Sequence, residues 1–97
     1  ISFGVAKVGR FTEKMHNLKE GDLIGVRGPY GNGFEIIGDR TLAVAGGIGS
    51  VPVLSAVEEF SKKGTSITTI LGGRTKNELL FMERFEKCGK LYPCTDD

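Results

Sequence analysis

The sequence has little net charge, no long apolar run and few cysteines, and each absence excludes a class of function. Thirteen Lys and Arg residues against twelve Asp and Glu residues leave a formal charge of +1, too weak to attract nucleic acid or an anionic membrane. No apolar run approaches the roughly 20 residues that a membrane helix needs, and the first residues lack the basic segment of a signal peptide. We therefore expect a cytoplasmic protein with small-molecule ligands, and neither nucleic acid nor a membrane as partner.

The two cysteines, Cys88 and Cys94, are too far apart for the C-x-x-C pair that ligates zinc or an iron-sulfur cluster. We predict free thiols, as is usual in a reducing compartment. The sequence therefore predicts no metal site in this chain.

The 15 glycines are concentrated between apolar runs, which indicates chain reversals and close backbone approaches rather than a flexible linker. The chain has 97 residues and an ordinary globular composition. It begins without Met and stops at Asp97, directly after a strand-like stretch. We expect it to be part of a longer protein.

The region 1–38 has the pattern of antiparallel β-structure with short connections. Strands are expected at Ile1–Val8 and Leu23–Arg27, with a short helix at Thr12–Leu18 that Thr12 caps. The glycine-rich stretch Gly28–Gly33 is expected to be a loop. This region is predicted to be a piece of an antiparallel sheet or barrel.

The region 39–97 alternates between strands and helices, so we place a boundary near Gly38-Asp39. Its first strand is a continuous apolar run, typical of a strand buried on both faces of a parallel sheet. The sequence Thr75-Lys76-Asn77-Glu78 fits a capping box that opens the second helix. The expected elements are strand Leu42–Ala45, a helix from Ser50 to a stop at Lys62-Lys63-Gly64, strand Ile67–Leu71, a helix that the capping box opens and that runs through Leu79, Met82 and Phe85 to about Lys87, and strand Leu91–Cys94. The fold class is α/β, with the first βαβαβ of a parallel, Rossmann-like sheet.

A glycine loop lies between the first expected strand of this region and its helix. Gly46, Gly47 and Gly49 bring backbone N–H groups close to a helix N-terminus, where they can bind phosphate. Pro52 holds the place of the third glycine of G-x-G-x-x-G, and the lysine of a Walker loop is missing. A tight turn without a ligand is the alternative.

The loops after all three expected strands meet at one edge of a parallel sheet, where open α/β sheets bind their ligands. Arg74 follows the second strand and is a candidate partner for a phosphate. Asp96 and Asp97 follow the third strand and are candidates for the ribose hydroxyls. Taken singly, each could instead be a surface charge or a turn residue.

Five segments in order carry a resemblance to a known family. The segments are Gly9–Thr12, Gly21-Asp22, Gly28–Phe34, Gly46–Pro52 and Gly73–Phe81. With these segments, the chain resembles the ferredoxin-NADP reductase superfamily over nearly its whole length, and within it most of all the electron-transfer subunits of dihydroorotate dehydrogenase.

The resemblance implies the end of an FAD-binding β-barrel domain at 1–38 and the beginning of an NAD-binding α/β domain at 39–97. It implies a flavin-dependent NAD oxidoreductase subunit of pyrimidine biosynthesis, passing electrons between a catalytic dihydroorotate dehydrogenase subunit and NAD through FAD and a [2Fe-2S] cluster. Gly9 and Thr12 would hold the FAD pyrophosphate, and Gly46, Gly47, Gly49 and Pro52 the nicotinamide nucleotide. Ile48 departs from the threonine often found in that loop. The flavin-ring contacts and cluster ligands would lie outside this chain.

Two alternatives stay open. The chain could come from a related reductase subunit of a hydrogenase or of a ferredoxin-NADP oxidoreductase, or it could be a non-catalytic nucleotide-binding module. The sequence does not decide between NAD and NADP. It assigns no catalytic residue, because hydride transfer between a flavin and a nicotinamide needs positioning more than acid-base chemistry. The chain alone is expected to be inactive.

Overall fold

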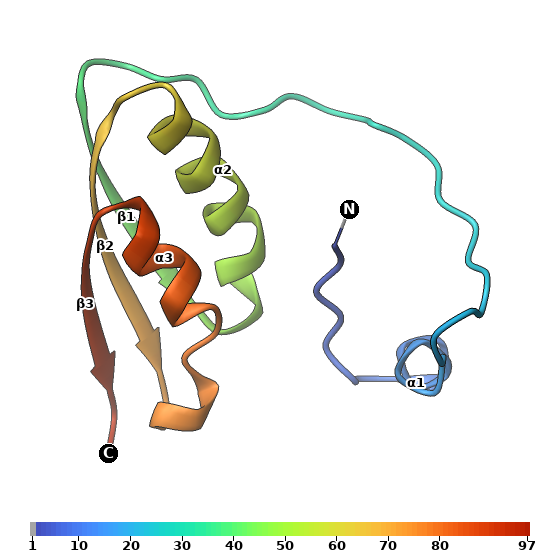
Figure 1. The fold of residues 1–97 in the computed structure, drawn as a ribbon. Coiled ribbons are helices and arrows are strands. Elements are labelled where there is room, and N and C mark those ends of the chain that lie inside the picture. Colours follow the sequence, from blue (N-terminus) through green and yellow to red (C-terminus); the bar gives the residue numbers. More distant parts are fainter. Residues whose placement is uncertain (1) are drawn as a thin grey trace. The chain divides into compact units, whose positions relative to one another are not determined.

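The computed structural model describes residues 2–97, which form two compact units (Figure 1). The first unit ends at Asn32 and the second comprises Gly33–Asp97. The predicted boundary at Gly38-Asp39 lies shortly after this division and just before the first strand. None of the helices in the described residues is long and apolar enough to cross a membrane.

The first unit contains one helix, α1 (Arg10–His16), and the structure assigns no strand to the described residues before Arg40. The strands expected at Ile1–Val8, of which Ile1 lies outside the described residues, and at Leu23–Arg27 are therefore not formed here. A strand is stabilised by a hydrogen-bonded ladder to a neighbour. Neither segment has such a ladder within residues 2–97, so an apolar alternation alone does not make it a strand.

The start of α1 depends on Gly9 and Thr12. Gly9 is the N-cap residue, and its carbonyl oxygen accepts a hydrogen bond of 2.8 Å from the Glu13 N–H. The Thr12 hydroxyl accepts from the N–H groups of Val8 and Gly9, at 2.9 Å each, and lies 3.0 Å from the Gly9 carbonyl oxygen, to which it donates. Thr12 thus caps the helix from inside its first turn, and the prediction that the helix starts at Thr12 is wrong.

The second unit is a βαβαβ unit with a three-stranded parallel sheet in the order β1-β2-β3. This arrangement confirms the predicted α/β class and the parallel sheet. Its elements are β1 (Arg40–Gly46), the 3₁₀ turn η1 (Gly47–Gly49), α2 (Ser50–Lys62), β2 (Ser66–Gly73), the 3₁₀ turn η2 (Lys76–Glu78), α3 (Met82–Cys88) and β3 (Lys90–Thr95).

The core lies between the sheet and its helices, which Figure 1 shows on the same side of the sheet. Alternate residues of β1 and β2 point into it, and α2 contributes residues at helical spacing. Because each crossover is right-handed and the strand order advances in one direction, both helices lie on one face. The buried apolar residues are Ala43, Ala45, Leu54, Val57, Phe60, Ile67, Leu71 and Phe85.

The opposite face of the sheet is exposed. Leu42 and Val44 on β1 are 65% and 66% exposed, and Ile70 and Tyr92 lie at exposed positions on β2 and β3. The prediction that the first strand is buried on both faces is therefore wrong for the described residues. The apolar run has the composition of a doubly covered strand, but residues 2–97 supply helices for one face only.

The capping box predicted at Thr75–Glu78 is also wrong. Thr75 makes no side-chain cap, and the turn after it is the 3₁₀ turn η2. The Glu78 carboxylate instead binds Arg74. As a result α3 begins later than expected, at Met82, with Phe81 in the left-handed region (φ 61°) as its N-cap residue.

Gly89, which joins α3 to β3, provides a test of how closely this junction packs against β2. A Cβ atom at residue 89 would overlap the carbonyl oxygen of Ile67. We expect Gly89→Ala to lower the free energy of unfolding by about 3 kcal/mol, since β2 backbone cannot move aside without breaking the sheet. Urea unfolding followed by circular dichroism measures the change. Gly49→Ala is the matched control, because a Cβ there meets no atom within 4 Å; equal losses in the two variants would contradict the packing.

Candidate functional site

The loops that follow the three strands lie side by side at the carboxyl edge of the sheet. Gly46 pairs with Gly72 in the register of β1 and β2, and Gly73 pairs with Thr95 in that of β2 and β3. The Asp96 N–H extends this contact by donating to the Gly73 carbonyl oxygen at 3.3 Å. The structure therefore places the ends of the three strands side by side, with Gly46, Arg74 and Asp96 at or directly after them.

The glycine loop is exposed, and the space that Cβ atoms would occupy at its glycines is empty. Gly47 has φ +54°, in the left-handed region that favours glycine. A Cβ at Gly47 or Gly49 would meet nothing within 4 Å, and one at Gly46 would meet only the Gly72 carbonyl oxygen, at 3.6 Å. The loop thus leaves space beside its backbone for a ligand.

The helix that follows this loop has no side-chain cap. Gly49 is the N-cap residue of α2 and also ends η1, so the Ser50 N–H already donates to the Gly47 and Ile48 carbonyl oxygens. The N–H groups at the start of a helix carry the positive end of its dipole. Pro52 lies in this first turn, where its missing N–H costs nothing. The arrangement suits an anionic group such as a phosphate.

Arg74, directly after β2, is held by Glu78. Its Nε and Nη2 donate to the two carboxylate oxygens, at 3.1 and 2.9 Å, and its backbone N–H donates to Oε2 at 3.2 Å. The hydrogen bond to Glu78 raises the pKa of Arg74, and the nearby charge of Asp96 also raises it. The same hydrogen bond lowers the pKa of the Glu78 carboxyl. In this structure Arg74 therefore already has an anionic partner.

Glu78 also lies at this edge, through its contact with Arg74, but it was not predicted as a site residue. Its position four residues after Arg74 was a usable signal, because opposite charges at that spacing can pair. Asp96 and Asp97 lie exposed beyond the end of β3, as predicted, and Asp96 is close enough to act on Arg74.

In the first unit, Gly9 and Thr12 lie at the start of α1, and the Thr12 hydroxyl is already used by the main chain. His16 at the other end of the helix has its Nε2 2.7 Å from the Val5 carbonyl oxygen. That contact ties α1 to the preceding segment. His16 thus has a structural partner.

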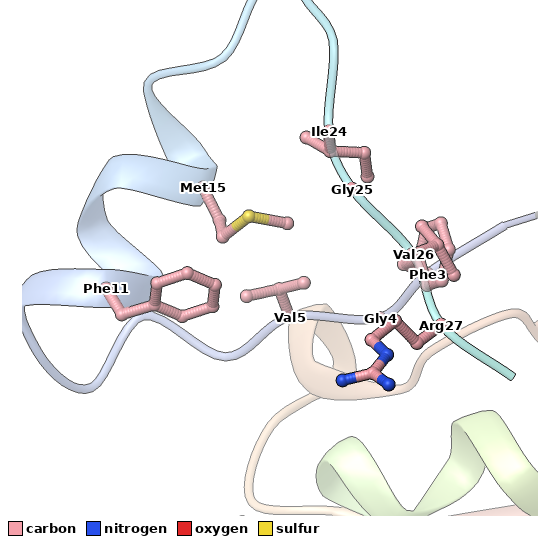
Figure 2. A pocket seen from close by; sticks show the side chains of 9 residues that line it. All are labelled: Phe3, Gly4, Val5, Phe11, Met15, Ile24, Gly25, Val26 and Arg27. Atoms are coloured by element: carbon pink, nitrogen blue, oxygen red, sulfur yellow. The ribbon is translucent and has the colours of Figure 1, made fainter. Parts of the chain in front are cut away.

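An apolar pocket of about 520 Å³, which the sequence analysis did not predict, lies in the first unit (Figure 2). Phe11 and Met15 of α1 line it together with Val5, and the segment Ile24–Arg27 lines the other side. Apart from the two α1 residues, its lining comes from the segments that were expected to be strands, and the alternating apolar residues there were the available signal. Apolar walls offer few donors to a pyrophosphate.

No cluster of three potential metal ligands occurs within residues 2–97. Both cysteines are free thiols, as predicted, and the Cys94 Sγ lies 3.7 Å from the Leu71 carbonyl oxygen.

Taken together, a parallel βαβαβ unit with an open glycine loop at a helix N-terminus defines an α/β unit of the Rossmann-like class. Comparison with solved structures agrees with this class. A chain of an NADH-dependent reduced ferredoxin-NADP oxidoreductase, described in connection with flavin-based electron bifurcation, has a TM-score of 0.83 at 36% identity, covering 95% of this chain and 34% of its own length.

Curated relatives share one description. A Methanocaldococcus jannaschii protein named "probable dihydroorotate dehydrogenase B (NAD(+)), electron transfer subunit" is 71% identical over 99% of this chain. A Methanothermobacter thermautotrophicus protein of the same name is 44% identical over 100% of the chain, and the Fusobacterium nucleatum subunit is 36% identical over 93%. The chain spans 37%, 37% and 36% of the lengths of these relatives. No protein-family model matches the chain.

These comparisons confirm the resemblance predicted from the five ordered segments. The chain is similar over nearly its whole length to electron transfer subunits of dihydroorotate dehydrogenase B, and its fold is found in a ferredoxin-NADP oxidoreductase. It corresponds to about a third of such a subunit. These relatives all belong to oxidoreductase systems that transfer electrons.

The contact between Arg74 and Glu78 predicts the titration of this carboxyl group. We expect NMR to show the Glu78 side chain titrating below its ordinary value of 4.5, and Arg74→Gln to return it toward that value, since the hydrogen bond from Arg74 is the main cause of the shift. Because the pKa is lowered, the stabilisation from the pair is present above the ordinary value and is lost as the pH falls through the lowered one. An unchanged midpoint in Arg74→Gln would contradict the contact.

Proposed function

We propose that the chain forms the nucleotide-binding part of an electron transfer subunit, which passes electrons between a catalytic dihydroorotate dehydrogenase subunit and NAD in pyrimidine biosynthesis. The observation that carries the proposal is the 71% identity over 99% of the chain with a relative of that name. The open glycine loop at the start of α2 supports it, because the loop fits a nucleotide phosphate. FAD and a [2Fe-2S] cluster belong to the proposal, with the cluster ligands outside this chain.

Each part of the carboxyl edge has a role in this proposal. Gly46, Gly47 and Gly49 let the pyrophosphate of NAD approach the first amides of α2, and Pro52 presets the helical turn that presents them. Asp96 and Asp97 accept hydrogen bonds from the ribose hydroxyls. Arg74 stands at the same edge, paired with Glu78, as the candidate cation beside the phosphates.

The FAD pyrophosphate is proposed to bind at the start of α1, beside Gly9 and Thr12. Because the Thr12 hydroxyl is engaged with Val8 and Gly9, its role is to hold the turn. The flavin and the nicotinamide supply the redox chemistry when bound, and the chain binds and orients them.

A second candidate keeps the fold and changes the partner. The similarity to a solved NADH-dependent reduced ferredoxin-NADP oxidoreductase, at 36% identity, favours a reductase subunit of that kind. Both candidates require a nicotinamide nucleotide at the glycine loop. They differ in the protein that exchanges electrons with this subunit.

The glycine loop can be tested without disturbing the fold. We expect Gly49→Val to weaken NAD⁺ binding to the full-length oxidised protein by at least about tenfold, because its side chain would fill the open space where the phosphate is proposed to lie. Calorimetric titration measures the affinity, and thermal unfolding checks stability.

Gly33→Val is the matched control, since a Cβ at Gly33 also meets nothing within 4 Å and Gly33 precedes the start of β1, whereas the glycine loop follows its end. Unchanged NAD⁺ affinity in Gly49→Val, or an equal loss in both variants, would refute the proposed phosphate site.

The partner distinguishes the two candidates. We expect the full-length protein, expressed in its own host with an affinity tag, to co-purify with a dihydroorotate dehydrogenase catalytic subunit and to show flavin and iron-sulfur absorbance. Co-purification with a ferredoxin-NADP oxidoreductase subunit would favour the second candidate. A protein that shows neither flavin nor cluster bands after reconstitution would contradict both.

A further inference from the structure

The sequence does not decide between NAD and NADP, but the carboxyl edge of the sheet carries charged side chains that bear on this preference. The two cofactors differ by a phosphate on the adenosine ribose, which replaces a 2′-hydroxyl. A carboxylate near that ribose accepts a hydrogen bond from the hydroxyl, whereas a free arginine accommodates the phosphate. Whether the Arg74 guanidinium is free or paired therefore bears on the choice between NAD and NADP.

Arg74 is held by Glu78 within a short local turn. The turn Thr75–Leu79 folds back on Gly73, where a Cβ would lie 3.2 Å from the Leu79 side chain and 3.3 Å from the Thr75 carbonyl oxygen. This close approach places the Glu78 carboxylate on both the backbone N–H and the guanidinium of Arg74. The bidentate geometry is the strong form of an arginine–carboxylate pair.

The charge around Arg74 is acidic. Glu78 contacts the guanidinium directly, and Asp96 at the end of β3 lies near enough to raise the pKa of Arg74. Arg74 thus has one carboxylate bound to it and a second nearby, in a turn that also carries Lys76. A 2′-phosphate that approached Arg74 would meet the Glu78 carboxylate and a guanidinium with two of its donors already engaged, whereas a ribose hydroxyl would meet an acceptor.

We propose that Glu78 is a specificity-determining residue: by occupying the guanidinium of Arg74, it disfavours the 2′-phosphate of NADP and selects NAD. This inference rests on the proposed nucleotide site at the glycine loop. Glu78 repels the 2′-phosphate and withholds guanidinium donors of Arg74 from it. Such unfavourable contacts commonly provide specificity against a close analogue.

Binding of NAD⁺ and NADP⁺ to the full-length oxidised protein, measured by calorimetry, tests the proposal. We expect the native protein to bind NAD⁺ more tightly than NADP⁺, and Glu78→Gln to shift the ratio of the two dissociation constants toward NADP⁺ by about tenfold, since one like charge is removed and Arg74 is released. In Arg74→Gln/Glu78→Gln the gained NADP⁺ affinity should be lost again. A purely structural role of Glu78 would weaken both nucleotides equally.

The chain supplies a matched control in a second bidentate pair, Arg84 with Glu58, which joins α3 to α2. Glu58→Gln removes the same charge away from this edge and should leave the ratio unchanged. A ratio within about twofold of native in Glu78→Gln, or an equal shift in Glu58→Gln, overturns the inference while NAD⁺ binding still supports the proposed site. If the native protein binds neither nucleotide, the site and the inference fail together.

Discussion

Parallel pairing of β1, β2 and β3 is the constraint on which the candidate site depends. In a parallel sheet all strands end at the same edge, so loops that are distant in sequence become neighbours. The register places Gly46 beside Gly72 and Gly73 beside Thr95. Without this pairing, the glycine loop, Arg74 and Asp96 would share no surface. The backbone hydrogen bonds between the strands therefore determine which residues meet at this edge.

The same topology explains the imbalance between the two faces of the sheet. Two right-handed crossovers in one direction put α2 and α3 on one face, where Ala43 and Ala45 allow the α2 side chains to pack closely. Leu42 and Val44 point the other way and stay exposed. The core is thus formed by one face of the sheet, and Ser50, the first residue of α2 directly after the glycine loop, is fully buried.

The sequence allowed prediction of the parts of the fold with a long periodic pattern or a contiguous apolar run. The α2 helix and the three strands of the second unit are of this kind, and their alternation was enough to place Arg74 and Asp96 at one edge. The strand pattern of Leu23–Arg27 failed because a strand also needs a partner, which composition does not reveal. Thr12 failed as an N-cap because it lies at the third helical position, from which its hydroxyl reaches back to the N–H groups of Val8 and Gly9.

Glu78 shows why the site was harder to predict than the fold. Its sequence context satisfies two local patterns at once: the last residue of a capping box after Thr75, and the partner of Arg74 four residues earlier. A cap offers one hydrogen bond to a neutral N–H, whereas Arg74 offers two from its guanidinium and one from its backbone, so the ion pair prevails. Arg74 is 80% exposed, and exposed pairs contribute little to stability. The Glu78 carboxylate therefore contributes little to folding, and its position at this edge is explained by the local contact with Arg74 rather than by the stability of the fold.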